Sequence, residues 1–218
     1  MAPIISIVGK SGSGKTTLLE KVISELTRRG YRVGVLKHDA HGFEIDHEGK
    51  DSWRHKQAGA SVVALSSPEK FAVIKDVEKE WPPERLIASY LSGVDVVVIE
   101  GFKKSPFPKI EVVRKANSSR PVCGKDKLLM AFASDFLVSR RLPVYKLNDF
   151  KGISDLIEER IIKGQRDPGV SLLVNGVKVE LKPFIENLLR DGVTGMIKSL
   201  KGCGQADEIE IRITRRGS

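Results

Sequence analysis

A glycine-rich stretch near the N-terminus constrains the fold of this chain more than any other feature. Residues 9–16 read GKSGSGKT and match the pattern G-x-x-x-x-G-K-[ST]. They follow an apolar run, Ile4 to Val8, and precede apolar residues at helical spacing, Leu18 to Leu26. Glycines in such a turn let backbone N–H groups point at phosphate oxygens, and the helix adds the positive end of its dipole. We therefore predict a phosphate-binding loop whose nucleotide ligands are Gly9, Lys10, Ser11, Gly12, Ser13, Gly14, Lys15, Thr16 and Thr17.

Three side chains of this loop have distinct predicted roles. Lys15 is expected to bridge the β- and γ-phosphates as a catalytic charge, and the Thr16 hydroxyl to ligate Mg²⁺. A glycine-rich turn that binds nothing is the alternative, but the full match between a strand and a helix argues against it. Lys10 resembles the signature lysine of a branch of P-loop ATPases that exchange it across a dimer. A solvated surface lysine is the other interpretation of Lys10.

A second motif is a hydrophobic strand with an acidic residue at each end, residues 95–101, DVVVIEG. The Mg²⁺-organising strand of P-loop proteins has this form. Ligands gather at the carboxyl ends of parallel strands, which selects Glu100 over Asp95 as the metal-organising and catalytic carboxylate. Asp95 is then a solvent-facing strand start.

The histidines are clustered. All four lie in residues 38–55, at His38, His41, His47 and His55, together with Asp39, Glu44, Asp46 and Asp51. One interpretation is a transition-metal site, which indicates a metal-delivery GTPase. Another is a switch loop whose acids complete the Mg²⁺ shell and whose polar residues sense the γ-phosphate. The absence of an accompanying cysteine favours the switch loop, and a solvated loop remains a third interpretation.

The remaining pattern predicts an α/β fold, a P-loop NTPase with a mostly parallel sheet flanked by helices. Further strands are expected at 31–36, 62–65, 71–74, 94–99, 110–113, 128–133 and 144–147, and helices at 52–58, 83–91 and 153–162. Residues 164–169 have linker composition, so we expect a P-loop domain over 1–165 and a small module over 170–218.

The C-terminal module is expected to have ββαβ order. Two strands flank Asn175-Gly176, a pair that supplies the positive φ angles of a two-residue turn. An amphipathic helix, 183–200, and a last strand, 208–213, follow. The apolar side chains of that helix, including Phe184, Leu188, Leu189 and Met196, are expected to be core residues.

Composition limits the class of partner and compartment. The formal net charge of +9 favours acidic partners, but basic residues are scattered among acids and aromatic residues total 6%, so nucleic acid is not the expected ligand. Cys123 and Cys203 lie 80 positions apart without metal-binding or disulfide spacing. The N-terminal residues show neither a signal pattern nor a membrane span, and we expect a cytoplasmic protein.

Taken together, several segments resemble the MobB family, the molybdopterin-guanine dinucleotide biosynthesis adapter proteins, over about residues 3–165. The segments are 9–17, then KHDAHGFEID at 37–46, GKDS at 49–52, AGA at 58–60, EGFK at 100–103, PKIE at 108–111 and ASD at 133–135. The combination of the Lys-His loop with Glu-Gly-Phe-Lys is more specific than the phosphate loop alone. The tail after Pro168 departs from the shorter members of the family.

The resemblance implies GTP and Mg²⁺ as ligands, with Mg²⁺ near Thr16 and Glu100. It implies Asp46 as a further, water-mediated metal candidate that couples its loop to the γ-phosphate. Lys103 and Lys109 would face an anionic pterin phosphate or the partner enzyme, with surface solubility as the alternative. There is no Asn-Lys-x-Asp element, so Asp135, at a strand end, is the candidate that accepts hydrogen bonds from guanine.

The expected function is a GTP-binding adapter in molybdenum cofactor biosynthesis, which assists the guanylyltransferase that uses GTP or molybdopterin. Turnover should be slow, because no arginine finger or water-positioning glutamine stands out beside the strand-end motifs. A small-molecule kinase using ATP, a metal-chaperone GTPase and a binding module without turnover are the alternatives. A homodimer is compatible with Lys10 and with the appended module.

Overall fold

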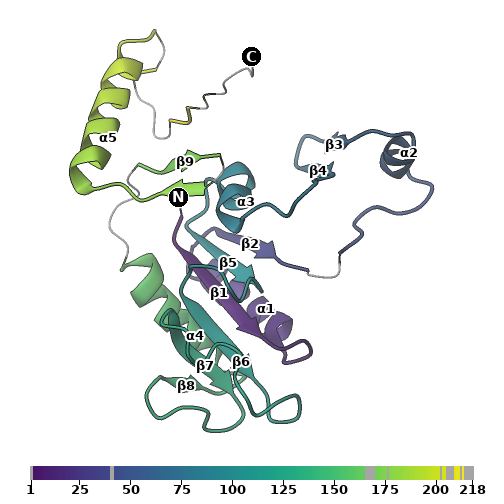
Figure 1. The fold of residues 1–218 in the computed structure, drawn as a ribbon, viewed down its shortest axis with the longest axis vertical. Coiled ribbons are helices and arrows are strands. Elements are labelled where there is room, and N and C mark those ends of the chain that lie inside the picture. The colour runs from purple at the N-terminus through teal and green to yellow at the C-terminus, as the bar shows by residue number, and fades with distance from the viewer. Residues whose placement is uncertain are drawn as a thin grey trace.

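A six-stranded parallel sheet forms the centre of the molecule (Figure 1). The computed structural model describes residues 2–39, 42–164, 170–175, 177–201, 203–204, 209–211 and 213. The strand order is β2-β5-β1-β6-β7-β8, and every neighbouring pair is parallel. The strands are β1 (Ile4–Gly9), β2 (Val33–Lys37), β5 (Val96–Glu100), β6 (Lys109–Val113), β7 (Leu129–Ser134) and β8 (Val144–Tyr145). The predicted α/β class with a mostly parallel sheet is confirmed.

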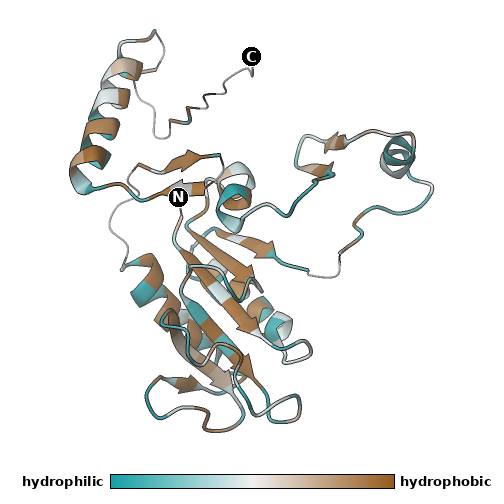
Figure 2. Cartoon of the chain, viewed as in Figure 1, coloured by the Kyte–Doolittle hydropathy of each residue, from teal (hydrophilic) through white to brown (hydrophobic). Residues whose placement is uncertain are grey.

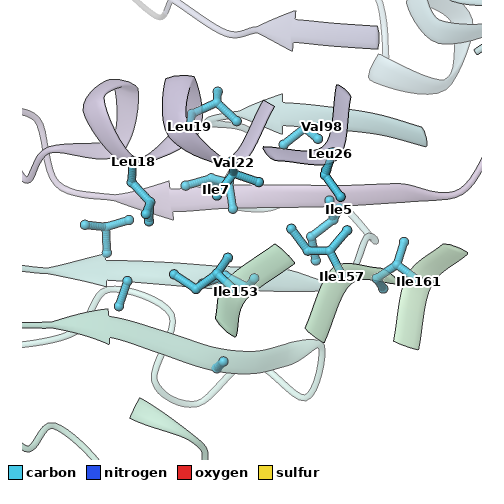
Figure 3. Packing of buried hydrophobic residues seen from close by; sticks show 14 of the residues in the cluster. Ile5, Ile7, Leu18, Leu19, Val22, Leu26, Val98, Ile153, Ile157 and Ile161 are labelled. Atoms are coloured by element: carbon cyan, nitrogen blue, oxygen red, sulfur yellow. The ribbon is translucent and has the colours of Figure 1, made fainter. Parts of the chain in front are cut away.

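Helices cover both faces of this sheet. The helix α1 (Lys15–Arg28) and the helix α4 (Phe150–Ile157), which continues as a π-helical turn, η1 (Glu158–Ile162), pack on one face. Four apolar residues of α1 recur at helical spacing and pack in one cluster with Ile153 and Ile157 of α4 on the same face of the strands: Leu18, Leu19, Val22 and Leu26 (Figure 3). On the other face α3 (Pro83–Tyr90) buries Ile87 against alternate residues of β1 and β5.

The register of the strands sets the place of the predicted motifs. Gly9, at the end of β1, pairs with Val112 of β6, and Lys37, at the end of β2, pairs with Glu100 of β5. The phosphate loop, the Glu100 motif and the first residues of the histidine loop therefore emerge at the same carboxyl edge, where parallel sheets bind ligands.

An arm extends away from the sheet between β2 and α3 (Figure 1). It carries α2 (Asp51–Gln57) and an antiparallel hairpin of β3 (Val62–Ser66) and β4 (Phe71–Lys75). The sequence predicts both strands, but they pair only with each other, because the hairpin is too far from the sheet to join it. Ala40 and His41, where the arm leaves the sheet, lie outside the described residues.

The C-terminal part contains a hairpin, β9 (Leu172–Val174) and β10 (Val177–Val179), and a helix, α5 (Pro183–Lys198). Asn175 has a φ of 52°, as the predicted tight turn requires, while Gly176 lies outside the described residues. The predicted last strand is wrong for the residues that can be checked, because Ile209, Glu210, Ile211 and Ile213 are not in a strand. Glu208 and Arg212, like the predicted linker residues 165–169, are outside the described part.

The helix α5 carries many apolar residues (Figure 2), and several of them are exposed. Phe184 is 73% exposed, Leu188 58% and Met196 70%, while Leu189 is half-buried. The expectation that these side chains form a core is wrong for the first three, because no element in the described part of the chain covers them. Among the described residues, no helix is long and apolar enough to cross a membrane.

Candidate functional site

Close backbone packing shapes the phosphate loop. A Cβ on Gly9 would lie 2.5 Å from the carbonyl oxygen of Val112, so β1 approaches β6 too closely for any other residue. Gly12 and Gly14 have φ angles of 70° and 92°, and Gly14 precedes the first residue of α1. The loop thus turns sharply from the sheet into the N-terminal end of α1, where unpaired N–H groups and the helix dipole favour an anion.

The predicted catalytic and metal-binding side chains of two strand ends meet here. The Thr16 hydroxyl donates a hydrogen bond of 2.8 Å to Oε1 of Glu100, although the residues are 84 positions apart. The Lys15 ammonium donates to the backbone oxygen of Lys10 at 2.9 Å, so it lies folded over the loop. Mg²⁺ prefers oxygen ligands such as hydroxyl and carboxylate groups, so Thr16 and Glu100 fit the predicted metal.

Positive charge accumulates around Lys15. Burial lowers the pKa of its ammonium, Glu100 opposes that shift, and the charges of Lys103 and Lys37 lower the pKa further. Both neighbours are exposed on the carboxyl edge, Lys37 as the last residue of β2 and Lys103 just after β5. Lys103 was predicted from the sequence as a site residue; Lys37 was not, although its position at a strand end could have indicated it.

A cavity of about 620 Å³ opens beside the loop. Its walls come from the start of α1 and from the segments after β7 and β8, and they include Thr17, Leu18, Asp135, Lys146 and Asn148. Asp135 lies in the wall where the sequence analysis placed a base-recognising carboxylate, and its Oδ1 accepts the Lys115 N–H at 2.8 Å. Lys146 and Asn148 were missed, because nothing in their local sequence marks them before β8 is placed beside β7.

A turn after β6 contacts the other side of the loop. The Asn117 amide donates to the carbonyl oxygen of Ser11 at 2.7 Å, and the Lys10 ammonium donates to the Ser118 hydroxyl at 2.6 Å. Neither contact was predicted, because the turn is about one hundred residues away in sequence. Lys10 is exposed, and its ammonium contacts Ser118 of the same chain.

Asp46 does not reach this site in the structure. It lies within the arm just before α2, where its Oδ1 accepts from the Ser52 hydroxyl at 2.9 Å and from the His47 N–H at 3.0 Å. No contact among the described residues joins it to Thr16 or Glu100, and the arm points away from the loop (Figure 1). The geometry assigns Asp46 to the start of α2 and does not support its predicted role in the metal shell.

Lys109 also differs from its prediction. Its side chain is fully buried, and its ammonium donates to the carbonyl oxygens of Ser105 and Phe107 and pairs with Asp126 at 3.0 Å. A lysine with these partners cannot face a pterin phosphate or another protein. Its isolated charge beside an apolar strand looked like a surface group because the sequence did not reveal the partner Asp126.

The histidines do not gather into a metal site in the described part of the chain, where no three His, Cys, Asp or Glu side chains form such a group. His41 lies outside that part. His38 contacts residues on both sides of the point where the arm begins. Its backbone N–H donates to the Glu100 carbonyl at 2.9 Å, its ring centroid lies 4.2 Å from that of Phe102, and its Nε2 is 2.7 Å from a carboxylate oxygen of Glu80.

This arrangement of a parallel sheet, a glycine loop leading into α1, and a Thr16–Glu100 pair defines an α/β protein of the P-loop class. The family model of MobB, described as molybdopterin guanine dinucleotide synthesis protein B, matches residues 4–135. The chain belongs to the MobB family.

Individual relatives agree with this assignment. The molybdopterin-guanine dinucleotide biosynthesis adapter protein of Haemophilus influenzae is 39% identical over 157 residues, which cover 72% of this chain and 88% of the relative. A crystal structure of molybdopterin-guanine biosynthesis protein B is 32% identical, with a TM-score of 0.60, and covers 72% of this chain and 99% of its own. A relative from Methanocaldococcus jannaschii, 24% identical over 243 residues, covers 96% of this chain, so its similarity extends into the C-terminal part.

Proposed function

We propose that this protein is a GTP-binding adapter in molybdopterin guanine dinucleotide biosynthesis. The observation that carries the proposal is the Thr16–Glu100 pair beside Lys15, in a loop whose residues Ser13, Gly14 and Thr17 line a cavity large enough for a nucleoside. The names of the relatives supply the pathway, since the Haemophilus influenzae protein is called a molybdopterin-guanine dinucleotide biosynthesis adapter protein.

The nucleotide would lie with its phosphates on the loop and its base in the cavity. Lys15 offsets phosphate charge, and the backbone N–H groups at the start of α1 donate hydrogen bonds to the phosphate oxygens. Thr16 and Glu100 would hold Mg²⁺, which when bound neutralises charge on the phosphates. Asp135 lies in the cavity wall with one oxygen already anchored by the Lys115 N–H, which fixes the carboxylate for recognition of guanine donors.

Hydrolysis is proposed to be slow. Asp46, the acid expected to act at the γ-phosphate, is held at the start of α2 instead. P-loop GTPases that lack a residue to position water turn over slowly until a partner completes the site. The guanylyltransferase of the pathway is the proposed partner, and the large apolar side chains exposed on the arm, Phe43, Ile45 and Phe71, support a role in protein contacts. A homodimer is proposed as well, and sedimentation of the purified protein at several concentrations would test it.

Calorimetric titration with GTP and with ATP, each with Mg²⁺, tests the proposal on the wild type and on Lys15→Ala. Preference for GTP that is lost in the variant is the expected result. Equal or tighter binding of ATP would contradict guanine recognition by Asp135 and favour a small-molecule kinase, the second interpretation of the phosphate loop.

A further inference from the structure

The turn formed by residues 114–118 contacts both the phosphate loop and the wall of the cavity. β6 runs beside β1 with Val112 in register with Gly9, so the residues after Val113 emerge next to the loop. The carbonyl oxygen of Arg114 accepts the N–H groups of Asn117 at 3.0 Å and Ser118 at 2.8 Å, which closes the turn.

Both sides of this turn are anchored to nucleotide-site elements. On one side the Lys115 N–H donates to Asp135 in the cavity wall. On the other side Asn117 donates to Ser11, and a Cβ on Gly12 would lie 3.1 Å from the same amide nitrogen. The turn therefore packs so closely on the phosphate loop that any residue other than glycine at position 12 would force Asn117 to shift.

The segment that follows the turn is fixed to buried groups of β6. Glu111, which is buried, accepts the backbone N–H groups of Val122 and Cys123, and Lys109 pairs with Asp126. Both side chains thus tie the long connection between β6 and β7 to the sheet. Such anchoring holds the start of that connection, residues 114–118, in one place.

The Arg114 side chain is exposed at this position and lines two hollows. One is the large cavity, and the other is a small crevice that Lys10 and Ser13 also line. In the described part of the chain the Arg114 guanidinium has no ion pair or hydrogen bond, and the buried Ser13 hydroxyl beside it has no hydrogen-bond partner. The phosphate oxygens of a nucleotide on this loop could pair with the Arg114 cation and accept a hydrogen bond from the Ser13 hydroxyl.

We propose that Arg114 binds the phosphate chain of the nucleotide and that Asn117 is a positioning residue for the phosphate loop. This inference rests on nucleotide binding at the loop but does not depend on the identity of the base. An arginine suits the role because its planar, permanently charged guanidinium can contact two phosphate oxygens at once.

The test is calorimetric titration with GTP, GDP and GMP in the presence of Mg²⁺, on the wild type, Arg114→Ala and Arg141→Ala. Arg141 is an exposed arginine in the loop before β8 and controls for the loss of one positive charge. The expected result is that Arg114→Ala weakens GTP and GDP binding on the order of tenfold or more. GMP affinity changes much less, and Arg141→Ala binds all three as the wild type does. Unchanged GTP affinity, or an equal loss for GMP, would overturn the role of Arg114.

Asn117→Ala tests the positioning role separately. GTP affinity should fall while the unfolding temperature of the nucleotide-free protein stays the same, because Asn117 is exposed and fixes only the loop. An unchanged affinity would overturn it. If the wild type binds ATP and GTP with equal affinity, the proposed guanine preference fails. The inference would still hold if Arg114→Ala lowers the affinity for both triphosphates.

Discussion

At the scale of single residues, the Thr16–Glu100 hydrogen bond joins two motifs that the sequence separates by 84 positions. We predict that Glu100→Gln and Thr16→Val each remove most of the increase in GTP affinity that Mg²⁺ produces, because a neutral amide or a methyl group is a poor ligand for a hard cation. GTP titrations with Mg²⁺ and with a chelator measure this effect.

Asp95→Asn is the matched control, since it changes the same charge at the opposite end of β5. Asp95 pairs with Arg32 at 2.9 Å, away from the phosphate loop. Equal Mg²⁺ dependence in Glu100→Gln and in the wild type would exclude Glu100 as a metal-organising carboxylate.

Two lysines of similar sequence context have opposite surroundings. Lys109 is fully buried on Asp126 and two carbonyl oxygens, whereas Lys103 is exposed. We predict that Lys109→Ala lowers the free energy of unfolding by about 3 kcal/mol, since it leaves buried partners unpaired. Lys103→Ala should change it by less than about 0.5 kcal/mol. Urea denaturation measures both, and a stable Lys109→Ala protein would show that the ion pair contributes little.

At the scale of elements, the C-terminal end of α1 is joined to α4 and η1 by a cluster of charges. Arg29 contacts Glu25 of its own helix, at 2.9 Å, and Asp155 and Glu158, at 2.7 and 2.8 Å. Lys163 also contacts Glu158, at 2.6 Å. Hydrogen bonds from Arg28 and Arg29 lower the pKa of Glu25 to about 2, and those from Lys163 and Arg29 lower that of Glu158 to about 2.

These pKa values predict an acid-dependent contribution to stability. An unfolded glutamate titrates near 4.5, so the paired carboxylates stabilise the fold fully above about pH 5 and lose that effect as the pH falls towards 2. Glu158→Gln should therefore lower the unfolding free energy at pH 7, and its difference from the wild type should shrink steadily below pH 4.5. Urea denaturation between pH 7 and pH 3 measures this, with the exposed neighbour Glu159→Gln as control. A difference that is independent of pH would contradict the assignment.

The elements also show where sequence reasoning succeeds. Continuous apolar runs predict the sheet strands, of which β1, β5 and β6 are buried along their whole length, and helical spacing of apolar residues predicts α1, α3 and α4. The same pattern predicts β3 and β4 as strands but does not predict that they pair with each other, since pairing depends on where the arm lies. The convergence of Lys15, Thr16 and Glu100 could be predicted, because strand ends converge in any parallel sheet. Arg114 and Asn117 could not, because a long connection of irregular structure brings them to the loop.

At the scale of the whole molecule, the core belongs to the segment before residue 165. Every buried residue of the three apolar clusters lies between Ile4 and Ile161. The C-terminal hairpin touches the rest of the molecule through β10 and α3, and α5 leaves its apolar face exposed. The MobB family model matches residues 4–135 and so does not extend into the C-terminal part.

We therefore predict that a chain ending at Gly164 folds and binds GTP as the full protein does. Its unfolding temperature should stay within about 3 °C, because few contacts cross between the two parts. Its binding of a hydrophobic dye should fall, since the exposed Phe184, Leu188 and Met196 are removed. Circular dichroism melts, GTP calorimetry and dye fluorescence on both chains measure these effects. A truncated chain that is unfolded would show that the C-terminal part stabilises the sheet, whereas one that is folded but changed in sedimentation would assign that part to subunit association.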